Sequence, residues 1–372
     1  MTGAPTRRDC LALGAAAVLA GAAAPAGSLD ELARAKGLRF GSAIGAAHGM
    51  ADPRNRAVIA AQCGLVVPEN ELKLYALKPK AEPGYQFAGA DAIVAFAKAN
   101  GMLFRGHTLL WNRNEFAPKW ILGHDFGGQA AAERWFTDYI AAVAGRYAGA
   151  AQSWDVVNES IDPKTGEMRD TVFTRQVGPE LLEIAFHAAR AAAPKAKLLY
   201  NDYMGWGPGD AKHRAGVLRL LERLKAKGAP IDAFGVQGHI ANGDAGNVIG
   251  FPAADQREWR RFIDEVRGMG LDILITEFDV NDTVLPADPA GRDAIAAAVA
   301  RDFLDVMLSY TEVKQLLSWG IVYRYSWLQT WWPRPDHIRK RPTLYDEAFQ
   351  PKPLREAVAA ASRAAPGRTP WA

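Results

Sequence analysis

Short hydrophobic runs alternate with amphipathic segments along most of the chain. Eight runs have the length and composition of strands: LRFGSAI (38–44), CGLVVPE (63–69), LFRGHTLL (103–110), SWDVVNE (153–159), AKLLYND (196–202), IDAFGVQ (231–237), LDILITE (271–277) and WGIVYRY (319–325). The segments between them repeat apolar residues at helical spacing, as in 178–194 and 213–228. Strands that alternate with helices in this way indicate a parallel sheet.

The number of these units predicts how the sheet closes. Eight strand–helix units fill the chain, so we predict the α/β fold class and a single (β/α)₈ (TIM) barrel. In such a barrel the active site is built at the carboxyl-terminal ends of the strands, where the loops to the helices begin. Chemistry should therefore be sought among the residues that end each run.

Composition narrows the class of protein. The chain has 372 residues, of which 49% are hydrophobic and 23% charged, and this is typical of a soluble globular protein. Its formal net charge of +3 is small for this length. The charge therefore gives no reason to expect nucleic acid or an anionic membrane as a partner.

The first segment has the features of an export signal. Arg7 and Arg8 precede a weakly apolar run that ends in small residues, and the run is too short to span a bilayer well. Adjacent arginines favour the twin-arginine route, and an ordinary Sec signal is the alternative. We predict that residues 1–26 are cleaved and that residues 27–372 form the catalytic barrel domain. The mature protein would be periplasmic or secreted, without stable membrane association.

Cysteine content bears on the mature fold. Removal of the signal would take Cys10 with it and leave only Cys63. One cysteine cannot form an internal disulfide, so the fold must depend on its core. We expect a monomer.

Polar and aromatic residues gather at the predicted strand ends. They are Glu69, Asn70, Lys73, His107, Glu159, Asn201, Asp202, Gln237, His239, Glu277, Trp319 and Trp327. A single glutamate after a strand is more often a capping or surface residue, and a single histidine is more often a hydrogen-bonded core residue. The functional interpretation gains weight because all of these residues would project from the same face of the barrel.

Two glutamates in this set form a candidate catalytic pair. Glu159 and Glu277 each end a buried strand, with no cation adjacent in the sequence. The fourth and seventh strands would face each other across the barrel mouth. Glycoside hydrolysis needs one carboxyl group as proton donor and another that is ionised. If the two lie roughly 5–5.5 Å apart, the ionised one is a nucleophile and the reaction retains configuration.

The ordered motifs resemble glycoside hydrolase family 10, the endo-β-1,4-xylanases. The resemblance extends from about Phe40 to Pro353. It rests on PENELK (68–73), RGHTLLW (105–111), WDVVNE (154–159), YNDY (200–203), FGVQGH (234–239), ITEFD (275–279) and the tryptophans at 319 and 327. Several motifs in order at matching strand ends are a specific signal, whereas an isolated Asn-Glu pair would be weak.

The resemblance implies a function and a role for each residue. Glu159 would be the general acid/base and Glu277 the nucleophile of a retaining enzyme that cleaves internal β-1,4 bonds of xylan through a covalent glycosyl-enzyme. The implied substrate-binding residues are Glu69, Asn70 and Lys73 at the sugar beyond the scissile bond, His107, Trp111, Asn158, Gln237 and His239 around the reacting sugar, Tyr203 near the acid/base, and Trp319 and Trp327 as an aromatic roof. We expect no cofactor and no metal ion.

These implied roles have physical reasons. Asn158 would hydrogen-bond the sugar 2-hydroxyl, a contact that strengthens in the transition state. Gln237 and His239 would hold Glu277 ionised, because hydrogen bonds to a carboxylate favour its charged form. Tryptophan faces cover the apolar face of a sugar ring. Trp331 and Trp332 would either extend this platform or pack the loop that carries them.

The chain also departs from the family pattern at several positions. Asn112 stands where the family usually has histidine. Leu74 follows Lys73 where an aromatic residue is common, and Val322 with Tyr323 replaces the usual Thr-Asp before the second tryptophan. None of these changes touches the glutamate pair, but they bear on the shape of the sugar subsites.

Three other interpretations compete with a xylanase. A metal-dependent barrel hydrolase would need clustered ligands such as His-x-His, and the seven histidines contain no such pair. A non-catalytic sugar-binding protein would not need two strand-end glutamates. The serious alternative is a retaining barrel glycosidase that acts on another β-linked glycan or on short xylo-oligosaccharides, which fold-level analogy cannot separate from a xylanase.

Overall fold

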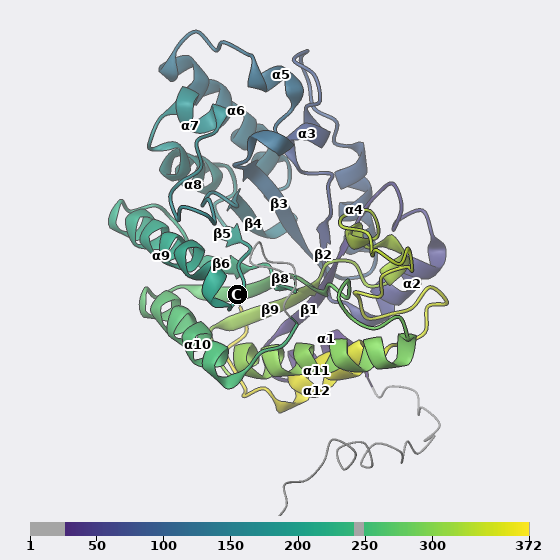
Figure 1. Ribbon diagram of the computed structural model, residues 1–372. Helices are drawn as coiled ribbons and strands as arrows, with labels where there is room; N and C mark the ends of the chain where they lie inside the picture. The colour runs from purple at the N-terminus through teal and green to yellow at the C-terminus, as the bar shows by residue number, and fades with distance from the viewer. Residues whose placement is uncertain (1–26, 242–248, 372) are drawn as a thin grey trace, which may run out of the picture.

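The computed structural model describes residues 27–241 and 249–371, so the predicted export signal lies outside the described residues. Its centre is a parallel sheet in the order β6-β5-β4-β3-β2-β1-β9-β8, closed by pairing of β6 with β8. Helices surround this sheet on its outer side (Figure 1). The predicted single (β/α)₈ barrel is confirmed.

Eight strands close the barrel: β1 (Arg39–Ile44), β2 (Leu65–Pro68), β3 (Leu103–Trp111), β4 (Ala151–Asn158), β5 (Lys197–Asp202), β6 (Ala233–Val236), β8 (Asp272–Val280) and β9 (Val313–Ser318). The ninth strand, β7 (His239–Ile240), pairs only with the end of β8. The strands are almost entirely buried, as expected for a parallel sheet covered by helices.

The α-helices are α1 (Leu29–Arg34), α2 (Pro53–Gln62), α3 (Leu74–Leu77), α4 (Ala88–Ala99), α5 (Lys119–Leu122), α6 (Gln129–Arg146), α7 (Val172–Val177), α8 (Leu181–Ala192), α9 (Ala211–Ala226), α10 (Ala253–Gly268), α11 (Pro289–Leu308) and α12 (Pro353–Ala364). Short 3₁₀ helices lie in the loops: η2 (Asn114–Phe116), η3 (Pro208–Asp210), η4 (Tyr323–Tyr325) and η5 (Trp327–Gln329). The long helix α11 begins where Asp288 accepts a hydrogen bond from Gly291 N at 2.7 Å, with proline at the first helical position. No helix among the described residues is long and apolar enough to cross a membrane.

The main core lies between the strands and the helices. Aromatic residues fill it on one side of the barrel, where Trp259 of α10 packs 6.3 Å from Phe303 of α11, measured between ring centroids. Smaller apolar clusters belong to neighbouring strands, such as the cluster that includes Leu65 and Val67 of β2. The barrel strands therefore have apolar support beneath their carboxyl-terminal ends.

The eighth strand was predicted in the wrong place. It is Val313–Ser318, which pairs with β1 and β8, and not 319–325. Gly320 has a φ of 86°, which takes the chain out of the extended conformation directly after Trp319. The aromatic and β-branched residues that follow have the composition of a strand, but they lie in the loop after β9 and are mostly buried there. Val322 makes an isolated bridge with Tyr345.

Candidate active site

The predicted glutamates stand at the carboxyl-terminal ends of their strands. Glu159 directly follows β4, and Glu277 lies in the last part of β8. Glu159 has a φ of 56°, a left-handed conformation that costs a non-glycine residue about 1–2 kcal/mol. Backbone contacts hold it there: Glu159 N donates to Asn201 O at 2.9 Å, and Arg169 Nε donates to Glu159 O at 3.0 Å.

The Glu159 carboxylate is surrounded by hydrogen-bond donors. Its Oε1 accepts from Gln237 Nε2 at 2.9 Å and from Asn158 Nδ2 at 3.3 Å. Its Oε2 accepts from Arg113 Nη1 at 3.1 Å. The cation that the local sequence lacks is therefore supplied by the loop after β3.

The Glu277 carboxylate has a different set of partners. Its Oε1 accepts from Asn201 Nδ2 at 2.8 Å, and its Oε2 lies 3.3 Å from His239 Nε2. Asn201 Nδ2 also lies 2.8 Å from Asn158 Oδ1, so one amide group bridges the surroundings of the two glutamates.

Electrostatics favour the charged form of Glu277. Burial alone would raise its pKa. The imidazoles of His107 and His239 and the ammonium group of Lys73 outweigh burial and lower the pKa to about 2. Burial likewise opposes the charging of His239, but Asp279 and Glu277 raise the pKa of His239 to about 10. The site therefore holds a carboxylate that stays ionised over the ordinary pH range.

Buried aspartates fix the two imidazoles. Asp279 Oδ1 lies 2.8 Å from His239 Nδ1, and Asp279 Oδ2 accepts from Trp327 Nε1 at 2.9 Å. Asp155 Oδ2 lies 2.8 Å from His107 Nδ1. Each aspartate thus orients one ring, and Asp279 also fixes the tryptophan that packs 5.0 Å from His239 between ring centroids.

The residues predicted to bind the next sugar form a second group beside the glutamates. Lys73 Nζ donates to Asn70 Oδ1 at 3.4 Å, and Tyr75 OH donates to the same oxygen at 2.7 Å. The Lys73 ammonium also lies 4.5 Å from the ring centroid of Trp111 and 5.6 Å from that of Trp319. Polar groups and ring faces therefore occur together, as sugar binding requires.

Glu69 belongs to this second group through its electrostatics. Burial raises the pKa of Glu69 to about 7, although Lys73 partly opposes the shift. Burial also lowers the pKa of Lys73. Both shifts have the same largest cause, which is burial at the carboxyl end of β2.

Tyr203 reaches the acid/base region through an arginine. Arg169 Nη2 donates to Tyr203 OH at 3.3 Å while its Nε holds the Glu159 backbone oxygen. Arg169 thus links the Tyr203 hydroxyl to the backbone of Glu159.

The departures from the family pattern are mostly buried under the loops. Asn112 is fully buried, and its Oδ1 accepts from Thr171 Oγ1 at 2.7 Å. Tyr323 is also buried, and its hydroxyl accepts from Arg341 Nη1 at 3.1 Å. These contacts tie loops together. Trp332, which is not one of these departures, is 49% exposed.

One predicted contact was wrong, and several partners were missed. The side chain of Gln237 bonds to Glu159 and not to Glu277, because its amide turns toward β4. Asn201 is the amide that holds Glu277. Asn201 and Asp279 stand in quoted motifs, so their strand-end positions were a usable signal. No sequence pattern indicated a role for Arg113, because its contact with Glu159 depends on the path of the loop after β3.

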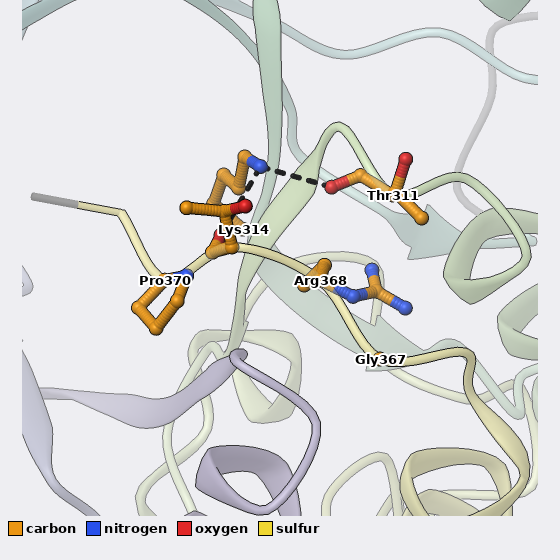
Figure 2. Close-up of a pocket in the computed structure, with 6 residues that line it drawn as sticks. Thr311, Lys314, Gly367, Arg368 and Pro370 are labelled. Atoms are coloured by element: carbon orange, nitrogen blue, oxygen red, sulfur yellow. Dashed lines mark hydrogen bonds between the residues drawn. The ribbon is translucent and has the colours of Figure 1, made fainter.

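Two hollows among the described residues lie away from these glutamates. One of about 560 Å³ is lined by Thr311, Lys314 and the segment 367–370, beside the start of β9 (Figure 2). Arg368 points its guanidinium group at the carbonyls of the 308–313 segment, and burial lowers its pKa to about 10. These contacts anchor the carboxyl-terminal segment to the barrel and bring no reactive group to the hollow.

Comparisons with known proteins agree with this architecture. The model of the family described as Glycosyl hydrolase family 10 matches residues 28–361. Endo-1,4-beta-xylanase 5 of Pyricularia oryzae is 31% identical over 360 residues, which cover 94% of this chain and 82% of the relative. Endo-1,4-beta-xylanase B of Paenibacillus barcinonensis is 33% identical over 307 residues, covering 79% of this chain and 87% of the relative.

Solved structures give the same result. Native xylanase 10B from Thermotoga maritima aligns with a TM-score of 0.79 and 29% identity, covering 90% of this chain and 98% of that structure. Xylanase 10B from Thermotoga petrophila in complex with xylobiose aligns with a TM-score of 0.79 and 28% identity, covering 92% and 98% of the two chains.

Proposed function

The chain belongs to glycosyl hydrolase family 10, and from this premise we propose that it is a retaining endo-β-1,4-xylanase. The proposal assigns the nucleophile to Glu277 and the general acid/base to Glu159. It also assigns internal bonds of xylan as the site of cleavage, through a covalent glycosyl-enzyme.

One observation carries the assignment: the two carboxylates share a hydrogen-bond network, and the groups around one of them, Glu277, hold it in its charged form. Gln237 donates from its side chain to Glu159 at 2.9 Å, and its backbone oxygen accepts from Glu277 N at 2.8 Å. Glu277 faces imidazoles and an ammonium group that lower its pKa to about 2. An ionised carboxylate a few hydrogen bonds from a second one suits the short separation, about 5–5.5 Å, of a retaining enzyme.

In the first step, Glu277 attacks the anomeric carbon as the bond to the leaving sugar breaks. Protonated Glu159 gives its proton to the leaving oxygen, so the aglycone departs as an alcohol. His239 keeps the attacking carboxylate oriented, because Asp279 holds its other nitrogen. Asn158 contributes a hydrogen bond to the 2-hydroxyl as positive charge develops on the sugar ring.

In the second step, Glu159 acts as a base. It takes a proton from water as the hydroxyl adds to the anomeric carbon, and Glu277 leaves with its electron pair. Two inversions give net retention. The donors around Glu159 stabilise the carboxylate that this step requires.

The relatives support xylan as the substrate. The two sequence relatives are named endo-1,4-beta-xylanases, and one structural relative is a xylanase complexed with xylobiose. Xylose lacks the hydroxymethyl group that glucose carries on C5, so a cleft can reject glucose by leaving no room for that group. Trp327, fixed by Asp279, is the side chain that we propose closes this space.

Product analysis on a panel of polysaccharides tests the proposal. The purified enzyme should release a ladder of short oligosaccharides from β-1,4-xylan, with a rapid loss of viscosity that reports internal cleavage. Cellulose and mannan should be turned over much more slowly. Equal rates on xylo- and cello-oligosaccharides of the same length would refute the substrate assignment and leave the two-glutamate mechanism standing.

A further inference from the structure

The contacts of Glu159 describe one of its two catalytic states. Its carboxylate oxygens accept from three nitrogen donors: Gln237, Asn158 and Arg113. An ionised carboxylate only accepts hydrogen bonds, whereas a protonated one also carries an O–H donor and has lost the negative charge that attracts a guanidinium group. The arrangement therefore fits the base of the second step, and protonation for the first step weakens the attraction of the one cationic partner in the described part of the chain, Arg113.

Arg113 is the contact best placed to open. Gln237 and Asn158 are almost fully buried, whereas the Arg113 side chain is 22% exposed. Its other terminal nitrogen, Nη2, lies 3.4 Å from Glu115 Oε1, and the Glu115 side chain is 63% exposed. The guanidinium group therefore spans two carboxylates, one in the cleft and one at its rim.

The loop that carries Arg113 allows a small movement and limits a large one. Arg113 lies between the end of β3 and η2, with its guanidinium carbon 5.0 Å from the ring centroid of Phe116. Phe116 in turn stacks on Trp111 with ring centroids 3.7 Å apart. An arginine that rests on an aromatic face can slide across it and keep that contact.

We propose that Arg113 is a positioning residue that alternates between Glu159 and Glu115 during the catalytic cycle. It would hold Glu159 ionised for attack by water and shift to Glu115 when Glu159 carries the proton. This inference rests on the proposed function. It predicts that Arg113 assists hydrolysis of the glycosyl-enzyme and not its formation.

Two aryl xylobiosides separate the steps. With 2,4-dinitrophenyl β-xylobioside the phenol leaves unaided, so the second step limits steady-state turnover. With phenyl β-xylobioside the leaving group needs the proton of Glu159, so the first step limits. Stopped-flow measurement of the dinitrophenolate burst gives the first-step rate directly.

Arg113→Met removes the cation and keeps the bulk of the side chain. On the dinitrophenyl substrate we expect an unchanged burst, a steady-state kcat about tenfold lower, and a KM that falls with kcat because the glycosyl-enzyme accumulates. The tenfold scale is that of one charge-assisted hydrogen bond. On the phenyl substrate kcat/KM should stay the same or rise. Arg113→Lys should recover part of the lost kcat.

Glu115→Gln tests the second partner. Without the Glu115 carboxylate, Arg113 has only Glu159 as an anionic partner among the described residues and should stay there. We therefore expect kcat/KM for the phenyl substrate to fall and kcat for the dinitrophenyl substrate to stay unchanged. Arg175, an exposed arginine paired with Asp170, provides the matched control. Arg175→Met should leave both substrates unaffected.

The inference is overturned if Arg113→Met slows the burst and the steady state alike, or changes neither. Equal losses in the burst rate and in the steady-state rate would mean that the ion pair between Arg113 and Glu159 has only a structural role. Wild-type enzyme without activity on either xylobioside would instead refute the proposed function. If Arg113→Met does not fold, the Arg113→Lys and Glu115→Gln comparisons still decide between the alternatives.

Discussion

The side-chain amide of Gln237 lies 2.9 Å from Oε1 of Glu159, and the backbone oxygen of the same residue accepts a hydrogen bond from Glu277 N at 2.8 Å. A single residue after β6 thus connects the glutamate that follows β4 with the glutamate in the last part of β8. Because the barrel strands are rigid, this connection fixes the relative placement of the two carboxylates before substrate arrives.

Replacement of the acid should have an effect that depends on the leaving group. Glu159→Ala should lower xylan hydrolysis by about 10²–10⁴-fold, the contribution of a positioned general acid. The burst from 2,4-dinitrophenyl β-xylobioside should change far less, because that phenol needs no proton. Steady-state and burst assays on both substrates provide the measurement. Equal losses would count against the acid role.

The pH dependence of stability should report Glu69. Its pKa of about 7 lies above the usual 4.5, so the folded protein holds this proton more tightly than the unfolded chain does. The stabilising contribution is present below pH 4.5 and is lost as the pH rises through 7. Glu69→Gln should therefore gain about 3 kcal/mol in unfolding free energy relative to wild type between pH 4.5 and 8. Denaturant titrations at the two pH values test this, and a constant difference would contradict it.

Trimming the aromatic roof should loosen substrate selection. Trp327→Ala removes the ring held by Asp279 and opens the space above the reacting sugar. We expect about tenfold slower cleavage of xylohexaose, the scale of one lost aromatic contact, and a smaller preference for xylose over glucose chains. Trp332→Ala, in an exposed ring farther along the loop, serves as the comparison. Selectivity that changes equally in both variants would argue against a special role for Trp327.

Export rests on residues outside the described part of the chain. We propose that Arg7 and Arg8 direct the precursor to the twin-arginine pathway, because that receptor reads the arginine pair and not charge alone. The double replacement Arg7→Lys, Arg8→Lys should abolish accumulation outside the cytoplasm. Cell fractionation and immunoblotting measure this. Normal export of the double variant would indicate the Sec route.

Much of the fold could be predicted because alternation is a local property. Seven of the eight strands were located to within a few residues by runs of apolar residues, and each run overlaps its observed strand. The eighth was misplaced because Val322 and its aromatic neighbours have strand-like composition but are buried by the loop after β9. Composition does not show that Gly320 turns the chain before them.

Only those site residues that lie at the ends of strands could be predicted from the sequence. Glu159, Glu277 and His239 follow from their strands, so the sequence located them. The hydrogen-bond partners of each carboxylate do not follow from strand positions, because side-chain rotamers decide which amide group donates to which glutamate. Arg113 lies in a loop whose path depends on the packing of Trp111 against Phe116, which no local pattern shows.

Trapping the covalent intermediate tests the central claim most directly. A 2-deoxy-2-fluoro xylobioside with a dinitrophenyl leaving group should inactivate the enzyme, because fluorine slows both steps while the good leaving group preserves the first. Mass spectrometry of the digested protein should then show the added mass of one 2-deoxy-2-fluoroxylobiosyl group on the peptide that contains Glu277. An adduct on any other residue, or no adduct from an enzyme whose first product from xylohexaose is the α-anomer, would contradict the account.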